Sequence, residues 1–187
     1  MIDKIESARQ KYKPAHIRLL FIAEAPPEAG SGRFFYFENV VQHDGLFLEM
    51  MKVLYDTQAL DASLVRKNKA KYLQRFQEDG FYLIDASDRP IVEGANKQGV
   101  IRQALPALIA RLDELNLVQT PIVLISKPVF EVCEKPLRTR GWNVINTETI
   151  NFPGSSQQEH FRRKLSGLLR AHGFQVSAEV DRPSLST

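Results

Sequence analysis

Apolar residues along this chain occur in two patterns, short continuous runs and longer stretches with helical spacing. Continuous apolar runs of four or five residues are typical of strands that are buried on both faces of a parallel sheet. Four such runs predict strands near residues 18–23, 81–85, 122–126 and 142–146. Helical stretches separate these runs, so the pattern predicts a three-layer α/β/α fold with a central four-stranded parallel sheet.

The helical stretches are marked by apolar residues three and four positions apart and by residues that favour helix ends. Asp44 is a good N-cap for the helix that follows it. Pro106 is expected to bend its helix or to begin a new one. Ser156 and Glu159 have the spacing of a capping box at the start of the last helix. Helices are therefore expected over residues 1–13, 46–54, 62–78, 98–115, 129–135 and from about 156 onward.

Length and composition indicate one globular domain. The 187 residues are 43% hydrophobic and 25% charged, which is close to the globular average. No internal repeat, low-complexity tract or domain linker interrupts the chain. We expect a single domain over residues 1–173, followed by a C-terminal tail over residues 174–187.

The charged residues and the one cysteine narrow the classes of partner and cofactor. A net charge of +3 is a weak argument for an anionic partner. The single cysteine, Cys133, excludes an internal disulfide and a cysteine-ligated cluster within one chain. No run has the length of a membrane helix, and the start has no signal-peptide pattern. We therefore expect a cytoplasmic monomer with no membrane contact, no metal and no cofactor.

Basic residues are concentrated in two blocks. Such blocks are usually solvated helix faces, and binding of phosphates is the alternative interpretation. The two blocks consist of Arg66, Lys67, Lys69, Lys71 and Arg75, and of Arg162, Arg163, Lys164 and Arg170.

Polar side chains follow the predicted strands at their carboxyl ends. Glu24, Asp85 and Ser126 each come at or directly after a buried run. Carboxyl ends of parallel strands share one rim, where open α/β sheets bind ligands. The segment 151–156 reaches the same rim and leads into the last helix, where exposed N–H groups can bind phosphates or carboxylates. The alternatives are a solvated acid at Glu24 and a plain loop-to-helix connection.

Four short motifs, in this order along the chain, resemble those of the uracil-DNA glycosylase superfamily. The first is similar to the version in the iron–sulfur branch, which has Gly where Ala23 stands. The resemblance extends over about residues 17 to 170 and implies the strand order second, first, third, fourth. It also implies a pocket for a base flipped out of DNA. The motifs are Ala23-Glu24-Ala25-Pro26, Gly32-Arg33-Phe34-Phe35, Leu83-Ile84-Asp85-Ala86 and Phe152-Pro153-Gly154-Ser155.

The resemblance assigns roles to particular positions. Glu24 and Asp85 are the expected catalytic residues. Contacts with the flipped base are expected from Ala25, Pro26, Phe34, Phe35, Asp85 and Phe152. Contacts with DNA phosphates are expected from Gly154, Ser155, Ser156 and Gln157. Arg162 and Arg163 are also expected to contact phosphates, because they cluster in the second basic block beside the start of the last helix.

Three features of the chain differ from those of the superfamily. The chain lacks the four cysteines of the iron–sulfur branch, and Phe152 stands where many members have a catalytic His. Asp85 replaces the usual Asn; an amide can both donate to uracil O4 and accept from N3–H, whereas an ionised carboxylate only accepts.

The expected activity is hydrolysis of the N-glycosidic bond of a flipped deaminated base in DNA, either uracil or a related base. A non-catalytic nucleic-acid or nucleotide-binding protein that retains the fold is the main alternative. An enzyme acting on a small nucleotide is the third interpretation.

Overall fold

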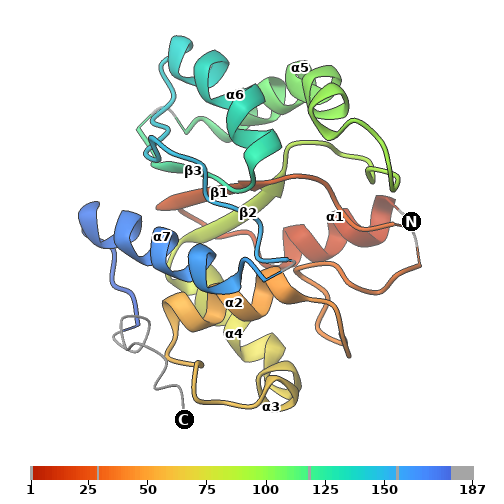
Figure 1. Cartoon of the computed structure of the whole chain (residues 1–187), viewed down its shortest axis with the longest axis vertical. Coiled ribbons are helices and arrows are strands. Elements are labelled where there is room, and N and C mark those ends of the chain that lie inside the picture. The colour runs from red at the N-terminus through yellow and green to blue at the C-terminus, as the bar shows by residue number, and fades with distance from the viewer. Residues whose placement is uncertain (1, 29, 118, 155, 178–187) are drawn as a thin grey trace.

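A parallel sheet of three strands forms the centre of the computed structural model, which describes residues 2–28, 30–117, 119–154 and 156–177 (Figure 1). The strands are β1 (Leu19–Ala23), β2 (Phe81–Asp85) and β3 (Ile122–Leu124), in the order β2-β1-β3. Every strand residue is buried, as expected for continuous apolar runs covered on both faces. The predicted α/β class and the order of the first three strands are confirmed.

The predicted fourth strand does not form. Val144 makes only an isolated parallel bridge with Ile122. Two residues further along β3, the N–H of Leu124 donates to the side-chain oxygen of Asn146 (3.0 Å), and its carbonyl accepts from the side-chain nitrogen (3.2 Å). The Asn146 amide thus stands in for a strand backbone, and the main chain leaves the sheet until a second bridge joins Ile150 to Ile125. The prediction of four strands was therefore wrong.

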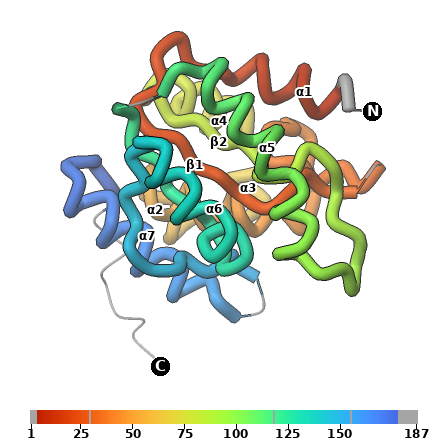
Figure 2. Tube along the Cα trace, turned by 90° about the horizontal axis from the view of Figure 1, so that it is seen from above, coloured from red at the N-terminus to blue at the C-terminus, as the bar shows by residue number. Residues whose placement is uncertain are grey.

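Helices cover both faces of the sheet. In Figure 1, α5 and α6 lie above the strands, while α2, α4 and α7 lie below them. The view from above in Figure 2 agrees, because α5 and α6 lie in front of β1. No helix of the described residues is long and apolar enough to span a membrane. The helices of the described residues are α1 (Ile2–Lys11), α2 (Gly45–Leu54), α3 (Ala62–Lys67), α4 (Lys69–Glu78), α5 (Lys97–Leu115), α6 (Lys127–Thr139) and α7 (Gln158–Ala171).

Two predicted helix features are corrected. The stretch 62–78 is divided into α3 and α4 at Asn68, whose side chain donates to the carbonyl of Leu64 (2.9 Å). The capping box at Ser156 and Glu159 is absent: α7 begins at Gln158 with Gln157 as N-cap, and Ser156 has φ = 64°. Pro106 lies inside a continuous α5 and does not begin a new helix.

The chain beyond α7 returns to the body of the domain. The Phe174 ring lies 6.1 Å from the Phe81 ring between centroids. The N–H of Ser177 donates to the carbonyl of Val53 in α2 (2.7 Å). Packing therefore continues four residues past Gly173, and the remainder of the predicted tail, residues 178–187, lies outside the described residues.

Candidate functional site

A cavity of about 250 Å³, here called the aromatic pocket, opens at the carboxyl ends of β1 and β2. Its volume is just below the range of about 300–1,000 Å³ that is usual for small-molecule pockets. The location matches the crevice expected in open parallel sheets. Segments that are far apart in sequence meet there, and its lining includes Ala25, Phe34, Phe35, Phe47, Asp85 and Phe152.

Asp85 contributes the buried carboxylate of the aromatic pocket. It is the last residue of β2 and lies opposite Ala23 of β1, which also lines the pocket. Asp85 Oδ2 accepts a hydrogen bond from Arg9 Nη2 of α1 (2.8 Å). Burial raises the pKa of Asp85 above its ordinary value, and the guanidinium of Arg9 opposes that shift. The side chain is thus held in a fixed position by a buried ion pair.

Arg9 links three parts of the site. Besides Asp85, its guanidinium binds Glu6 of α1 (2.5 Å) and lies 5.3 Å from the centre of the Phe34 ring. Burial alone would lower the pKa of Arg9, but the carboxylates of Asp85 and Glu6 outweigh it and raise the pKa. Arg9 therefore remains charged in a place where water has little access.

Glu24 points away from the aromatic pocket. Backbone pairing continues past β1, because the carbonyl of Glu24 accepts from the N–H of Ser87 (3.0 Å). Successive side chains of an extended chain point to opposite faces, and Ala23 and Ala25 line the pocket. Glu24 consequently lies on the other face, where its carboxylate binds Lys97 Nζ of α5 (2.7 Å). The predicted catalytic acid is near the pocket but is not part of its lining.

The aromatic run at residues 34–37 is largely core. Phe34 and Phe35 are 2% and 6% exposed, although both line the pocket. The Phe35 ring packs against the rings of Tyr36, Phe47 and Phe76, with centroids 5.0–5.7 Å apart. Because both rings are packed into the pocket wall, a ligand can reach only the small part of each ring that faces the cavity.

Phe152 differs from the other aromatic residues because 40% of it is exposed. It lies on the segment before α7, next to the start of α2: a Cβ added to Gly45 would lie 3.5 Å from the carbonyl oxygen of Pro153. Pro26, also expected to contact the base, is buried outside the lining, and Pro27 lines the pocket instead.

Tyr36 fastens the aromatic segment to the strand that carries Asp85. Its hydroxyl donates to the carbonyl of Leu83 (3.2 Å) and accepts from the N–H of the same residue (2.7 Å). Complete burial raises the pKa of this phenol well above its ordinary value, so the hydroxyl retains its proton. The positions of Phe34, Phe35 and Asp85 are therefore set as one unit.

A second buried carboxylate, Asp44, also lines the pocket. Asp44 is the N-cap residue of α2 as predicted, but its side chain does not bond to the helix. Its Oδ1 instead accepts two hydrogen bonds from Arg66 (2.7 and 2.9 Å). Its Oδ2 lies 3.6 Å from Lys69 Nζ, and neither of these two atoms has a hydrogen-bond partner among the described residues.

Lys69 is a functional candidate that the sequence did not single out. Its side chain is fully buried, and Nζ lies 4.3 Å from the centre of the Phe47 ring, a lining residue of the pocket. Burial lowers the pKa of Lys69 from 10.5 to about 8, against the effect of Asp44. Lys69 belongs to a basic block that is typical of a solvated face, and its burial follows only from the packing of α4 on α2.

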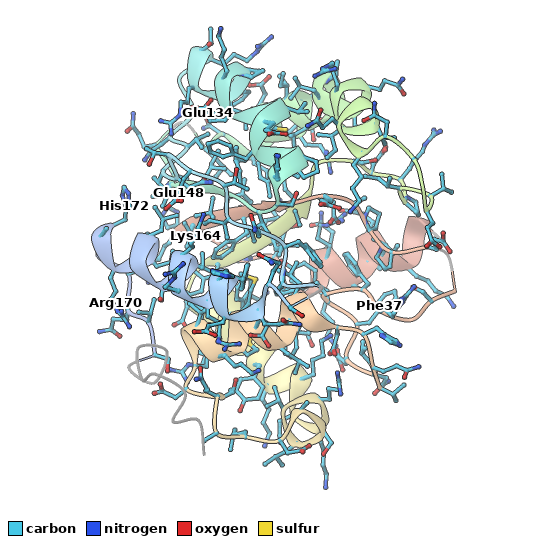
Figure 3. All side chains as sticks on the ribbon, in the orientation of Figure 1. Phe37, Glu134, Glu148, Lys164, Arg170 and His172 are labelled. Atoms are coloured by element: carbon cyan, nitrogen blue, oxygen red, sulfur yellow. The ribbon has the colours of Figure 1, made fainter. Side chains whose placement is uncertain are left out.

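The expected phosphate contacts near α7 are occupied by other partners. Arg162 is ion-paired with the buried Glu49 of α2. Lys164 binds Glu148 (2.8 Å), and Figure 3 shows both side chains at the same end of the molecule. Arg163 Nη2 lies 3.2 Å from Nδ1 of the His160 ring.

The turn that precedes α7 contributes little to the pocket. Within 152–157, only Phe152 among the described residues lines it. Gln157 Oε1 accepts a hydrogen bond from Asn151 (2.8 Å), and Ser156 is exposed. Gly154 is half-buried, and Ser155 lies outside the described residues.

Comparison with known proteins does not assign a family or a function to this site. No protein-family model, curated protein or solved structure matches the chain. Among the described residues, no group of three His, Cys, Asp or Glu side chains could hold a metal ion. The function is therefore argued from the pocket itself.

Proposed function

We propose that this protein binds a single nucleobase, flipped out of DNA, in the aromatic pocket and hydrolyses its N-glycosidic bond. One observation carries the proposal. Five of the six residues expected to contact a base line the same pocket, although they come from four separate stretches of the chain: Ala25, Phe34, Phe35, Asp85 and Phe152.

Recognition of the base follows from what the pocket offers. The exposed ring of Phe152 supplies a stacking surface at the opening, and base–aromatic stacking contributes about 1–3 kcal/mol. As the carboxylate partner of Arg9, Asp85 would accept hydrogen bonds from a base and could not donate them. The pocket therefore favours a base that presents an N–H group to Asp85, such as the N3–H of uracil or the N1–H of hypoxanthine.

Hydrolysis would add water to C1′ of the sugar and break the bond from C1′ to the base nitrogen. The bonding electron pair leaves with the base, which takes up a proton, and an abasic deoxyribose remains. Glu24 lies between Ala23 and Ala25 of the lining, but its carboxylate faces Lys97 and would have to turn toward the pocket opening to reach this water. Its role would be to orient or deprotonate the water after release from Lys97.

A non-catalytic base-binding protein is the second candidate. The ion pair between Glu24 and Lys97 favours it, because it holds the carboxylate on the face of the strand that points away from the pocket. The Phe at position 152 also leaves no imidazole at the position where many superfamily members have one.

The decisive experiment measures abasic sites after incubation with oligonucleotides that contain uracil, hypoxanthine, xanthine or a mismatch. Wild-type protein should release one base, and Glu24→Gln should lower that rate by about 10²–10⁴-fold while binding is retained. Glu134→Gln is the matched control, because Glu134 forms a comparable pair with Arg138 on α6 (2.6 Å) and neither residue lines the pocket. Its rate should equal that of wild type.

Asp85→Asn separates base choice from catalysis. The amide keeps an acceptor for Arg9 and adds a donor for uracil O4, so the preference should shift toward uracil. If neither wild type nor Asp85→Asn releases any base but both bind DNA in a base-dependent manner, the second candidate holds. Binding that ignores the base would contradict both.

A further inference from the structure

Next to the aromatic pocket lies a second cavity of about 350 Å³, here called the side pocket. It is formed by the two loop segments 31–33 and 39–43. The same two segments also contribute Arg33 and His43 to the aromatic pocket. The two cavities therefore adjoin, and Arg33 and His43 form their shared wall.

Arg33 and His43 are both exposed, and neither makes a hydrogen bond or ion pair with any residue that the structure describes. This distinguishes Arg33 from the other basic residues near the site, since Arg9, Arg66, Lys69 and Lys97 each have a carboxylate neighbour. A guanidinium without a carboxylate partner presents its full set of donors to a ligand.

The remaining lining of the side pocket suits an anion. Asn39 and Gln42 supply side-chain amides, and no carboxylate is part of the lining in the described ranges. Ser31 Oγ is buried and has no hydrogen-bond partner among the described residues. A buried hydroxyl without a partner is unfavourable unless a ligand or water completes it.

We propose that the side pocket binds a phosphate group attached to the nucleotide whose base occupies the aromatic pocket, with Arg33 as the principal contact and His43 as the second. The proposal rests on the proposed function, because it takes the base as the neighbouring group. It assigns phosphate binding to loop residues instead of to Arg162 and Arg163. Arginine binds phosphate oxygens through two parallel N–H donors, which a lysine or an amide cannot reproduce.

The test uses short single-stranded oligonucleotides with one deoxyuridine, labelled for fluorescence anisotropy. In separate oligonucleotides, the phosphate on the 5′ side, the phosphate on the 3′ side or a phosphate several nucleotides away is replaced by an uncharged methylphosphonate. One of the two adjacent replacements should weaken binding to wild-type protein by about 10-fold, the usual effect of losing a charged hydrogen bond. The distant replacement should change affinity less than about 2-fold, because it lies beyond close electrostatic reach.

Arg33→Gln should bind every oligonucleotide with the weakened affinity and should no longer distinguish the adjacent methylphosphonate. The slope of the logarithm of the binding constant against the logarithm of salt concentration should fall by about 0.7–1, as expected for one lost phosphate contact. Arg140→Gln is the matched control: Arg140 is exposed at the end of α6, toward the opposite end of the sheet from the pocket. It should behave as wild type.

The source of the phosphate is tested by titrating deoxyuridine, deoxyuridine monophosphate and inorganic phosphate. A monophosphate that binds as tightly as the oligonucleotide, in an Arg33-dependent manner, identifies a free nucleotide as the ligand and still supports the site. Discrimination of the methylphosphonate that survives in Arg33→Gln, or that is absent in wild type, overturns the proposal.

The two proposals fail in different ways. Arg33-dependent binding of inorganic phosphate without any influence of the base would leave the phosphate site standing and contradict base recognition. Base-dependent binding that is indifferent to Arg33 would contradict only the phosphate site.

Discussion

On the buried wall of the aromatic pocket every charged side chain has a charged neighbour, whereas Arg33 and His43 on its open rim have none among the described residues. The wall pairs Asp85 with Arg9 and Asp44 with Arg66 and Lys69. Buried charges must be paired because their desolvation is costly, so the wall uses its charges mainly to fix geometry. Exposed charges need no partner, so those of the rim are available to a ligand. The difference separates variants that should affect folding from variants that should affect binding.

Arg9→Met should have the largest effect on folding. It leaves the Asp85 carboxylate buried without its partner, and removal of one member of a buried pair lowers the free energy of unfolding by about 3–5 kcal/mol. Urea denaturation at neutral pH measures the loss. The double variant Arg9→Met/Asp85→Leu should recover most of it, because no uncompensated charge remains. A single variant within about 1 kcal/mol of wild type would show that the wall does not depend on this pair.

Lys69 should make folding depend on pH in the alkaline range. The unfolded chain holds the lysine proton up to its ordinary pKa of 10.5, whereas burial lowers the pKa in the folded state to about 8. The unfolded state therefore binds more protons between these values, and stability should rise with pH there. The full difference corresponds to about 3 kcal/mol.

The measurement compares wild type with Lys69→Met at several pH values from 7 to 10. Subtraction cancels the groups that titrate in both proteins. Lys69→Met should gain over wild type most at pH 7, and the gap should narrow toward pH 10. A gap that stays constant would mean that Lys69 is not buried as a cation.

Phe152→Ala should have the smallest effect on folding and a clear effect on binding. The ring is exposed, so the free energy of unfolding should change by no more than about 0.5 kcal/mol. Loss of a stacking surface should weaken binding of a base-containing oligonucleotide by about 10-fold. Phe152→Trp serves as the control and should retain affinity. Equal affinity for Ala and Trp at this position would remove Phe152 from the binding surface.

The sequence was informative where local pattern decides the structure. Continuous apolar runs located the three strands, and the rule that parallel strands end at one rim anticipated that Ala25, Asp85 and Phe152 would lie near one another. The orientation of the Glu24 side chain could also be predicted from the sequence. Ala23 and Ala25 share one face of an extended chain, so the residue between them must lie on the other face.

The remaining features depend on contacts between distant segments. Arg9 and Asp85 are 76 positions apart, and nothing in either neighbourhood indicates that α1 docks against the end of β2. Asn146 replaces a strand backbone with its side-chain amide, a substitution that an apolar pattern does not reveal. Burial of Lys69 contradicts the usual behaviour of a lysine in a basic block and results from tertiary packing alone.

The hydroxyl of Tyr36 also affects whether two copies of this protein can pair through the edge of the sheet. β2 is an edge of the three-stranded sheet, and an edge strand with free backbone groups is a template on which another chain can add a strand. At Leu83 both backbone groups are already taken by one phenol oxygen. A second molecule approaching this edge would meet an aromatic ring and no free pair of groups at its midpoint. The side chain that fixes the position of the pocket wall thus also blocks strand addition, a route to aggregation, at the middle of this edge.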